Sequence, residues 1–173
     1  MSNQRGDLSG QNIVLVGMMG SGKTSVGQAI SAMTGMSFVD TDDLIEDRLG
    51  MTIPAIFSQH GEPFFRTTEE AVVGEAAAKS NSVIATGGGV ILKPTNMMVL
   101  KKTGFVVYLH CGLSQLLERI KGDEGRPLLS KLEEIFAVRE PLYNKYSDFT
   151  VNVEGATIDE LAGIIYREYS RSV

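Results

Sequence analysis

The chain has very little of what covalent cross-links, zinc sites or membrane spans require. Cys111 is the only cysteine, so an intrachain disulfide is excluded. Together with His60 and His110, the only histidines, it does not make a convincing zinc site. No apolar run approaches the length of a membrane span, and the polar start of the chain lacks the apolar core of a secretory signal. These absences predict a cytoplasmic protein.

The chain also lacks an excess of basic charge. It carries 16 Lys and Arg residues against 21 Asp and Glu residues, for a net charge of −5. This balance argues against broad binding to nucleic acid or to an anionic membrane. A hydrophobic content of 43% over 173 residues suits one compact domain, and no low-complexity linker or repeat divides the chain. We therefore expect a single domain over residues 1–173, with small-molecule partners.

Short apolar runs alternate with helix-like stretches along the chain. The strand-like runs are residues 13–16, 37–40, 83–86, 105–110 and 149–153. The helix-like stretches are residues 23–33, 42–49, 63–79, 93–101, 113–121, 131–140 and 158–169. This alternation predicts a parallel sheet covered by helices. The loops after the first three strands should then meet at one edge of the sheet, where such proteins bind ligands.

The first of these loops, GMMGSGKT at residues 17–24, has the pattern of a phosphate-binding loop. Its glycines allow successive backbone N–H groups to turn toward one anion. Lys23 can reach the β- and γ-phosphates, and the Thr24 hydroxyl can ligate Mg²⁺. A chance glycine-rich turn is the alternative, and the strand before and helix after the loop disfavour it. We expect ATP as ligand, with candidate contacts at Gly17, Gly20, Ser21, Gly22, Lys23, Thr24 and Ser25.

The second loop carries acids directly after an apolar run. The third and fourth predicted strands run into glycines and into His110-Cys111, so we assign Asp40 to the Mg²⁺ site, through water, alongside Thr24. Asp42 would then face the phosphoryl acceptor, hold its hydroxyl and take its proton. The alternative is that both acids only cap the helix that follows.

A glycine triplet at residues 87–89 follows the third strand. Without side chains, this backbone can approach a ligand closely and offer it N–H groups. A tight turn is the alternative for such a triplet. Its position beside the other two loops favours a binding site.

Together these segments resemble the shikimate kinase family of P-loop proteins over nearly the whole chain. The resemblance is carried by GMMGSGKT, DTD at 40–42, FFRTTE at 64–69, TGGG at 86–89, RPLL at 126–129 and REPLY at 139–143. It implies an α/β, three-layer P-loop kinase fold with a five-stranded parallel sheet in the order 2-3-1-4-5 and a mobile lid near residues 122–131. It also implies Mg²⁺-dependent transfer of the ATP γ-phosphoryl group to the 3-hydroxyl of shikimate, on the route to chorismate and aromatic amino acids, by a monomer.

The family's substrate carries a carboxylate and several ring hydroxyls. Guanidinium groups match carboxylates in bidentate geometry, and the resemblance assigns this task to Arg66 and Arg139. Glu69, one helical turn after Arg66, could brace it, although the two could equally form a solvated surface pair. The candidate substrate contacts implied by the resemblance are Asp42, Phe57, Phe65, Arg66, Gly88, Gly89 and Arg139.

The polar, glycine-bearing stretch before Arg126 has the composition of a lid. Its closure would exclude water and bring Arg126 to the transferring phosphoryl group. A flexible surface loop with a solvated arginine is the alternative. The candidate catalytic residues are therefore Lys23, Asp42 and Arg126.

The chain departs from the family pattern in two places. Arg119 matches a position that borders adenine, but the loop at 152–156 lacks the basic residue often found there. Arg126 and Arg139 are 139 − 126 = 13 positions apart, several fewer than the family leads us to expect. Either the lid is short, or mobile residues of this segment are absent from the sequence.

Two other functions compete with the shikimate interpretation. Gluconate kinases share the broad fold and also phosphorylate a polyhydroxy acid, so a substrate panel must separate the two. A nucleotide-dependent switch without phosphotransfer is the second alternative. Residues 144–147, Asn-Lys-Tyr-Ser, lack the Asp of the guanine-reading motif, which argues against a GTPase.

Overall fold

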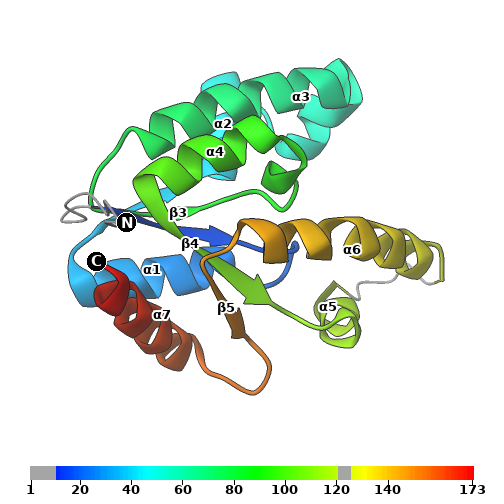
Figure 1. Ribbon diagram of the computed structural model, residues 1–173. Helices are drawn as coiled ribbons and strands as arrows, with labels where there is room; N and C mark the ends of the chain where they lie inside the picture. Colours follow the sequence, from blue (N-terminus) through cyan, green and yellow to red (C-terminus); the bar gives the residue numbers. More distant parts are fainter. Residues whose placement is uncertain (1–10, 121–125) are drawn as a thin grey trace, which may run out of the picture.

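The computed structural model describes the backbone of residues 11–120 and 126–173 and the side chains of residues 11–119 and 131–173. In this part of the chain, five parallel strands form one sheet in the order β2-β3-β1-β4-β5, as predicted (Figure 1). The strands are β1 (Asn12–Val16), β2 (Ser37–Asp40), β3 (Ser82–Ala85), β4 (Gly104–His110) and β5 (Phe149–Asn152). Because all neighbours run parallel, the carboxyl ends of the strands lie at the same edge.

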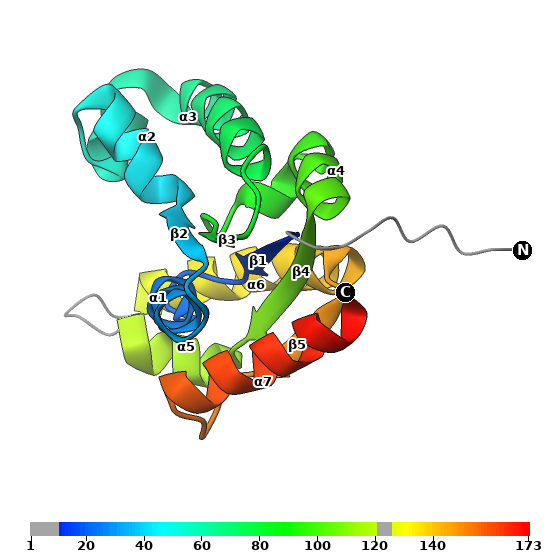
Figure 2. The same ribbon diagram turned by 90° about the vertical axis from the view of Figure 1, so that its left-hand side faces the viewer.

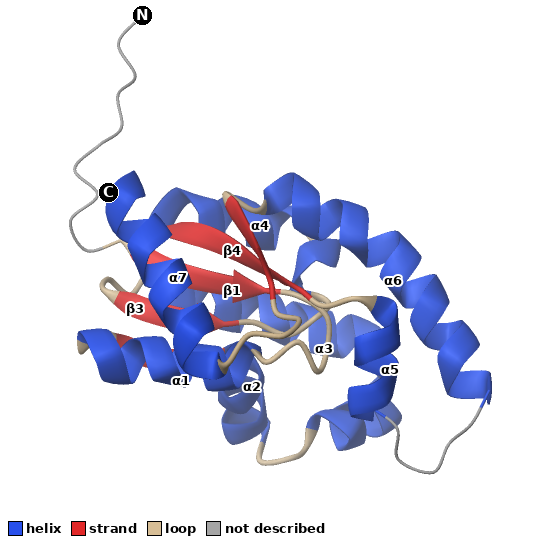
Figure 3. Cartoon of the chain, turned by 90° about the horizontal axis from the view of Figure 1, so that it is seen from below, coloured by secondary structure: helices blue, strands red, loops and turns tan. Residues whose placement is uncertain are grey.

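Helices cover both faces of the sheet. They are α1 (Lys23–Thr34), α2 (Thr41–Leu49), α3 (Ile53–Ala77), α4 (Pro94–Thr103), α5 (Leu113–Ile120), α6 (Arg126–Tyr146) and α7 (Ile158–Ser172), with a 3-10 turn η1 (Val90–Leu92). Helices α1 and α7 lie side by side on one face, while α3 and α4 lie on the other (Figure 2). Seen from below, α1 and α7 pass in front of the strands and α6 behind them (Figure 3). None of the helices in the two described ranges combines the length and apolar content needed to cross a membrane.

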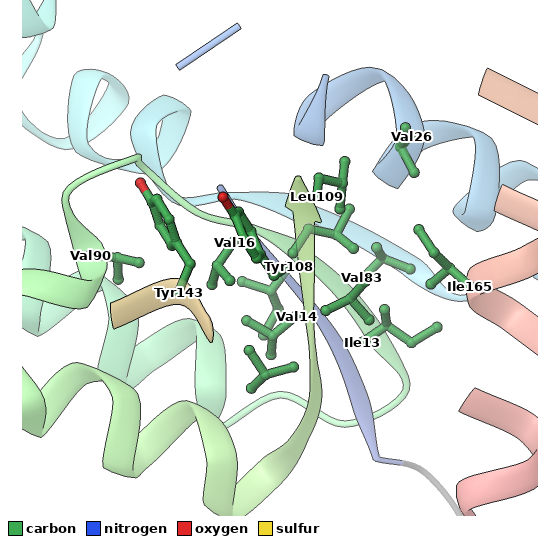
Figure 4. Close-up of a cluster of buried hydrophobic side chains, with 14 of the residues drawn as sticks. Ile13, Val14, Val16, Val26, Val83, Val90, Tyr108, Leu109, Tyr143 and Ile165 are labelled. Carbon is green, nitrogen blue, oxygen red and sulfur yellow. The ribbon is translucent and has the colours of Figure 1, made fainter. Parts of the chain in front are cut away.

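Strand β1 lies at the centre of the core. Ile13 and Val14 are fully buried because helices cover both faces of the strand (Figure 4). The buried Asn12 is the polar exception: its amide nitrogen donates to Lys79 O at 2.7 Å, and its amide oxygen accepts from Ser82 N at 3.0 Å. These bonds satisfy a buried amide and fix the start of β1 beside β3.

Helix α3 starts ten residues earlier than the predicted helix, at Ile53 instead of residue 63. The Thr52 hydroxyl caps this first part by accepting from Ala55 N at 3.4 Å. At Gly61, φ is 80°, so the helix is broken there and resumes in a second part that begins near Pro63. The range Ile53–Ala77 of α3 therefore consists of two helical segments separated by a kink at Gly61.

A small second cluster holds α2 against α3. Its buried members are Ile45 from α2 and Ile56, Phe65 and Val72 from α3. Since Phe65 is itself a predicted substrate contact and Arg66 follows it, this cluster sets where that part of α3 faces. The packing of α2 and α3 thus positions one wall of the site.

Helix α6 is also longer than predicted, extending through the exposed Pro141 to Tyr146. Tyr143, beyond the proline, is fully buried. The backbone of the expected lid from Arg126 onward belongs to α6. Residues 121–125 lie outside the described residues.

Candidate active site

A cavity of about 450 Å³ opens at the carboxyl edge of the sheet. The loops after β1, β2 and β3 line it, together with α3 and α6. It brings together predicted residues from the nucleotide, metal and acceptor groups, namely Gly20, Gly22, Lys23, Thr24, Ser25, Asp40, Asp42, Phe57, Phe65, Arg66, Gly88, Gly89 and Arg139. Gly17, Ser21 and Arg119 are not among the residues that line it.

The loop between β1 and α1 has the backbone of a phosphate cradle. Gly20 and Gly22 have φ values of 77° and 95°, in the left-handed region that favours glycine. The Lys23 ammonium lies inside the loop and donates to Gly17 O and Met18 O, each at 2.8 Å. The loop therefore holds its lysine at the start of α1, where the positive end of the helix also favours an anion.

Thr24 and Asp40 form the candidate metal position. The Thr24 hydroxyl donates to Asp40 Oδ2 at 2.7 Å. The other Asp40 oxygen accepts from Asp42 N at 2.9 Å, so Asp40 caps α2 as well. A hydroxyl and a carboxylate beside a phosphate loop fit Mg²⁺, which takes few protein ligands and completes its shell with phosphate and water. The described residues contain no cluster of three or more His, Cys, Asp or Glu side chains suited to a metal.

Asp42 is not a cap and is directed toward the glycine loop. A Cβ placed on Gly87 would lie 2.6 Å from Asp42 Oδ1, so a larger residue there would displace the carboxylate. Burial, followed by the charges of Asp40 and Glu69, raises the pKa of Asp42 to about 6. A carboxylate with this pKa is suited to accept a proton near neutral pH.

The Lys23 ammonium is shifted in the opposite sense. Burial lowers its pKa to about 8, although the charges of Asp42 and Asp40 act to raise it. Both shifts reflect charges held out of water in the same cavity. A polyphosphate bound in the loop would favour the charged form of Lys23.

Arg66 and Glu69 form a buried ion pair on the second part of α3. Arg66 Nη1 donates to Glu69 Oε2 at 2.7 Å, and only 1% of the Glu69 side chain is exposed. The alternative of a solvated surface pair is therefore wrong. Burial raises the pKa of Glu69, while the hydrogen bond from Arg66 acts to lower it. The pair fixes the guanidinium of Arg66 at the cavity wall.

The two predicted carboxylate-binding arginines flank the glycine loop from different helices. Arg66 comes from α3 and contacts the position where Gly89 would carry a Cβ. Arg139 comes from α6, and its Nη1 lies 3.3 Å from the corresponding position at Gly88. A side chain at Gly89 would displace the Arg66 guanidinium, and one at Gly88 would crowd that of Arg139. The folded chain thus places two arginines, 73 positions apart (139 − 66 = 73), around one loop.

Two aromatic rings form another wall. The ring centroids of Phe57 and Phe65 are 4.6 Å apart, with an interplanar angle of 33°. Phe57 is 36% exposed, whereas Phe65 is 4% exposed. Both line the cavity, which agrees with an apolar surface against one side of a ring-shaped substrate.

The remaining predicted residues lie at the nucleotide side. Arg119 Nη1 donates to Gly20 O at 2.9 Å, so this side chain contacts the outside of the phosphate loop. In the loop after β5, Glu154 accepts from Gly112 N at 3.1 Å and occupies the region where a basic residue was expected. The side chain of Arg126 lies outside the described residues.

Several residues of the site could not be assigned from their pattern alone. The Thr41 hydroxyl accepts from Gly87 N at 3.2 Å, and the Thr86 hydroxyl donates to Leu15 O at 2.8 Å, so both fix the glycine loop. Their presence inside the DTD and TGGG segments was the available signal. Met19 and Ile53 also line the cavity without any signal of their own.

A parallel sheet with a phosphate loop at its carboxyl edge, an acid facing that loop and two arginines beyond it define a P-loop kinase of a small anionic molecule. Residues 19–169 match the family model described as shikimate kinase. The chain belongs to the shikimate kinase family, whose members are ATP-using kinases.

Relatives of known sequence and structure agree with this assignment. A shikimate kinase from Caldanaerobacter subterraneus subsp. tengcongensis is 41% identical over 92% of this chain and 96% of the relative. One from Thermodesulfovibrio yellowstonii is 44% identical over 93% and 96%, respectively. The solved structure of a shikimate kinase from Acinetobacter baumannii in complex with shikimate matches with a TM-score of 0.87 and 38% identity, over 94% of each chain.

Proposed function

We propose that the protein transfers the γ-phosphoryl group of ATP to the 3-hydroxyl of shikimate, giving shikimate 3-phosphate and ADP. One observation carries this proposal: Lys23 and Asp42 lie in the same cavity as Arg66 and Arg139. The first pair suits phosphoryl transfer to a hydroxyl, and the second suits a substrate carboxylate.

On the acceptor side, the two guanidinium groups would hold the carboxylate and thereby orient the ring. The Gly88 and Gly89 backbone would contact ring hydroxyls, and the pair Phe57 and Phe65 would cover one side. Asp42 would hold the 3-hydroxyl and take its proton as the oxygen attacks phosphorus. Its raised pKa matches that task.

On the nucleotide side, the amides of the phosphate loop and Lys23 would bind the β- and γ-phosphates. Thr24 and Asp40 would hold Mg²⁺, with Asp40 acting through water, and the ion would neutralise phosphate charge. Gly17, Gly20, Ser21, Gly22 and Ser25 complete the proposed nucleotide contacts.

Two arginines extend this proposal beyond the described cavity. Arg126, at the start of α6, would reach the transferring phosphoryl group when the lid region near 122–131 closes. Arg119, already at the phosphate loop through Gly20 O, would border the adenine. An added arginine on the transferring group is worth about 10³ to 10⁵ in rate, so loss of the Arg126 side chain should lower the rate measurably.

We assign the reaction to a single-domain monomer in the cytoplasm, on the route to chorismate and aromatic amino acids. One chain supplies the proposed phosphate, acceptor and metal contacts, which supports a monomer. The net charge of −5 supports small-molecule partners and argues against nucleic acid or an anionic membrane. Light scattering of the purified protein, with and without ligands, tests the oligomeric state.

The deciding experiment measures ADP release from MgATP with shikimate, with gluconate and with no acceptor. A Lys23→Ala variant provides the background. Shikimate-dependent release that disappears in the variant is expected. Gluconate-dependent release would assign a different acceptor, and release independent of any acceptor would refute phosphotransfer to shikimate.

A further inference from the structure

The buried Tyr143 contacts the glycine loop through its hydroxyl. Its hydroxyl donates to Gly88 O at 2.5 Å and lies 3.8 Å from the sulfur of Met18 in the phosphate loop. Gly88 and Gly89 line the cavity, whereas Tyr143 is not among the lining residues. The tyrosine therefore holds the loop without itself lining the cavity.

The bond to Gly88 O determines where the next amide points. In a trans peptide, the C=O and the N–H of one plane point in opposite directions. Since the Gly88 carbonyl is directed at Tyr143, the Gly89 N–H points away from Tyr143, and Gly89 itself lines the cavity. Within the described part of the chain, neither the Gly88 amide nor the Gly89 amide has an assigned acceptor. The Gly89 N–H is thus a donor that a ligand can use.

The position of Tyr143 on α6 links this amide to a predicted substrate contact. Tyr143 follows Arg139 by four residues, so both side chains lie on one face of the helix. Arg139 Nη1 lies beside the position of a Cβ on Gly88, and the Tyr143 hydroxyl holds the Gly88 carbonyl. One turn of α6 therefore sets both the position of the Arg139 guanidinium and the orientation of the Gly88–Gly89 peptide.

A second tyrosine provides a natural comparison. The ring of Tyr108, on β4, stacks on that of Tyr143 with centroids 4.9 Å apart and an interplanar angle of 21°. Figure 4 shows the two rings side by side with their hydroxyl oxygens at the same end. The Tyr108 hydroxyl is buried but makes no hydrogen bond to any described residue. Both tyrosines take part in the ring stacking, but of the two only Tyr143 forms a hydrogen bond to the glycine loop.

We propose that Tyr143 is a positioning residue for the acceptor: its hydroxyl orients the Gly88–Gly89 peptide so that the Gly89 amide donates to a hydroxyl oxygen of the bound substrate. This inference rests on the proposed function. Burial raises the pKa of Tyr143 to about 12, so the phenol stays protonated and remains a donor throughout the working pH range.

The test compares Tyr143→Phe with Tyr108→Phe, each of which keeps the ring and removes one hydroxyl. We expect Tyr143→Phe to raise KM for shikimate about three- to tenfold, within the range for one lost hydrogen bond. Its KM for ATP and its kcat should stay within about twofold of the wild-type values, because neither depends directly on that bond. Tyr108→Phe should change none of these values. A general loss of packing would instead affect both variants and both substrates.

Shikimate analogues that each lack one ring hydroxyl sharpen the test. For the analogue without the hydroxyl that the Gly89 amide contacts, wild type and Tyr143→Phe should bind equally. An unchanged KM for shikimate in Tyr143→Phe, an equal rise in Tyr108→Phe, or the same penalty with every analogue would overturn the inference. Wild-type protein without shikimate-dependent turnover would overturn the proposed function itself, so the two failures are distinguishable.

Discussion

Replacing Asp42 with Asn should make the protein more stable while it strongly slows phosphoryl transfer. In the free protein, burial and the charges of Asp40 and Glu69 disfavour the Asp42 carboxylate, which raises its pKa from 3.8 to about 6. The folded state therefore binds this proton more tightly than the unfolded state. Above pH 6 the carboxyl is ionised in both states, and folding carries the full cost of that buried charge.

The magnitude follows from the size of the shift. A shift of about two units corresponds to about 3 kcal/mol at 1.36 kcal/mol per unit. Asp42 is partly exposed and lies in the first turn of α2, where the helix dipole favours a negative charge by about 0.3–1 kcal/mol. We therefore expect Asp42→Asn to gain about 1–2 kcal/mol at pH 7.5, or roughly 2–8 °C in Tm. Near pH 4 most of the gain should disappear, because the carboxyl is then protonated in the folded state and only about half ionised in the unfolded state.

Urea unfolding without nucleotide or Mg²⁺ measures this difference at pH 7.5 and near pH 4. Asp159→Asn is the matched control, since it removes one exposed negative charge from the first turn of another helix, α7. Asp42→Asn that gains no more stability than Asp159→Asn at pH 7.5, or that is equally stabilised at both pH values, would refute the reasoning.

The same variant has an activity arm. Loss of a proton acceptor typically costs about 10² to 10⁴ in kcat, whereas ATP affinity should be largely spared because the phosphate loop is intact. Turnover equal to the wild type would remove Asp42 from its assigned task. A variant that is both more stable and inactive would show that the buried charge of Asp42 lowers the stability of the protein and is required for activity.

Three further variants test other parts of the structure. Arg139→Lys should raise KM for shikimate at least tenfold, since lysine lacks the bidentate fork, while KM for ATP changes little; steady-state kinetics with each substrate varied in turn would show this. Asn12→Ala should lower the free energy of unfolding by about 2–3 kcal/mol because it leaves buried backbone groups without partners, and urea denaturation that shows no loss would contradict the tie between β1 and β3. Thr157→Ala removes the capping box with Glu160 at the start of α7 and should cost about 1 kcal/mol in the same assay, with the surface change Ser170→Ala in the last turn as its control.

The phosphate loop could be predicted in detail because its constraints are local. Gly20 and Gly22 need left-handed backbone, and Lys23 follows them directly at the start of a helix. The order of the five strands could not be predicted from local sequence; it came from the family resemblance and not from periodicity. Alternation of strands and helices predicts a parallel sheet but does not specify which strands are neighbours.

The two helices that were predicted too short show how packing overrides local signals. Gly61 and Pro63 read as breaks, yet Thr52 with Pro54 carries a helix-start signal that would have extended α3 toward the N-terminus. Pro141 reads as a helix end, but α6 continues because Tyr143 is buried beyond it. The proline is exposed, so water can satisfy the carbonyl that its missing N–H leaves free.

Contacts between distant positions could not be predicted from sequence alone. Nothing in the FFRTTE segment shows that Glu69 is buried, because its burial depends on how α3 packs on the rest of the chain. Likewise, 55 positions separate Tyr143 from Gly88. Sequence patterns place residues on elements, whereas the support behind a site depends on the tertiary packing of those elements.

The central place of β1 in the sheet bears on how the chain is made. This strand leaves the ribosome first, yet its two neighbours are β3 and β4, which are synthesised much later. Until β4 has emerged, a nascent chain presents the apolar residues Ile13–Val16 with at least one unpaired edge, a surface prone to aggregation. Fragments that end before Gly104 should therefore depend on chaperones, and the nucleotide loop attached to β1 gains its final support only after most of the chain has been translated.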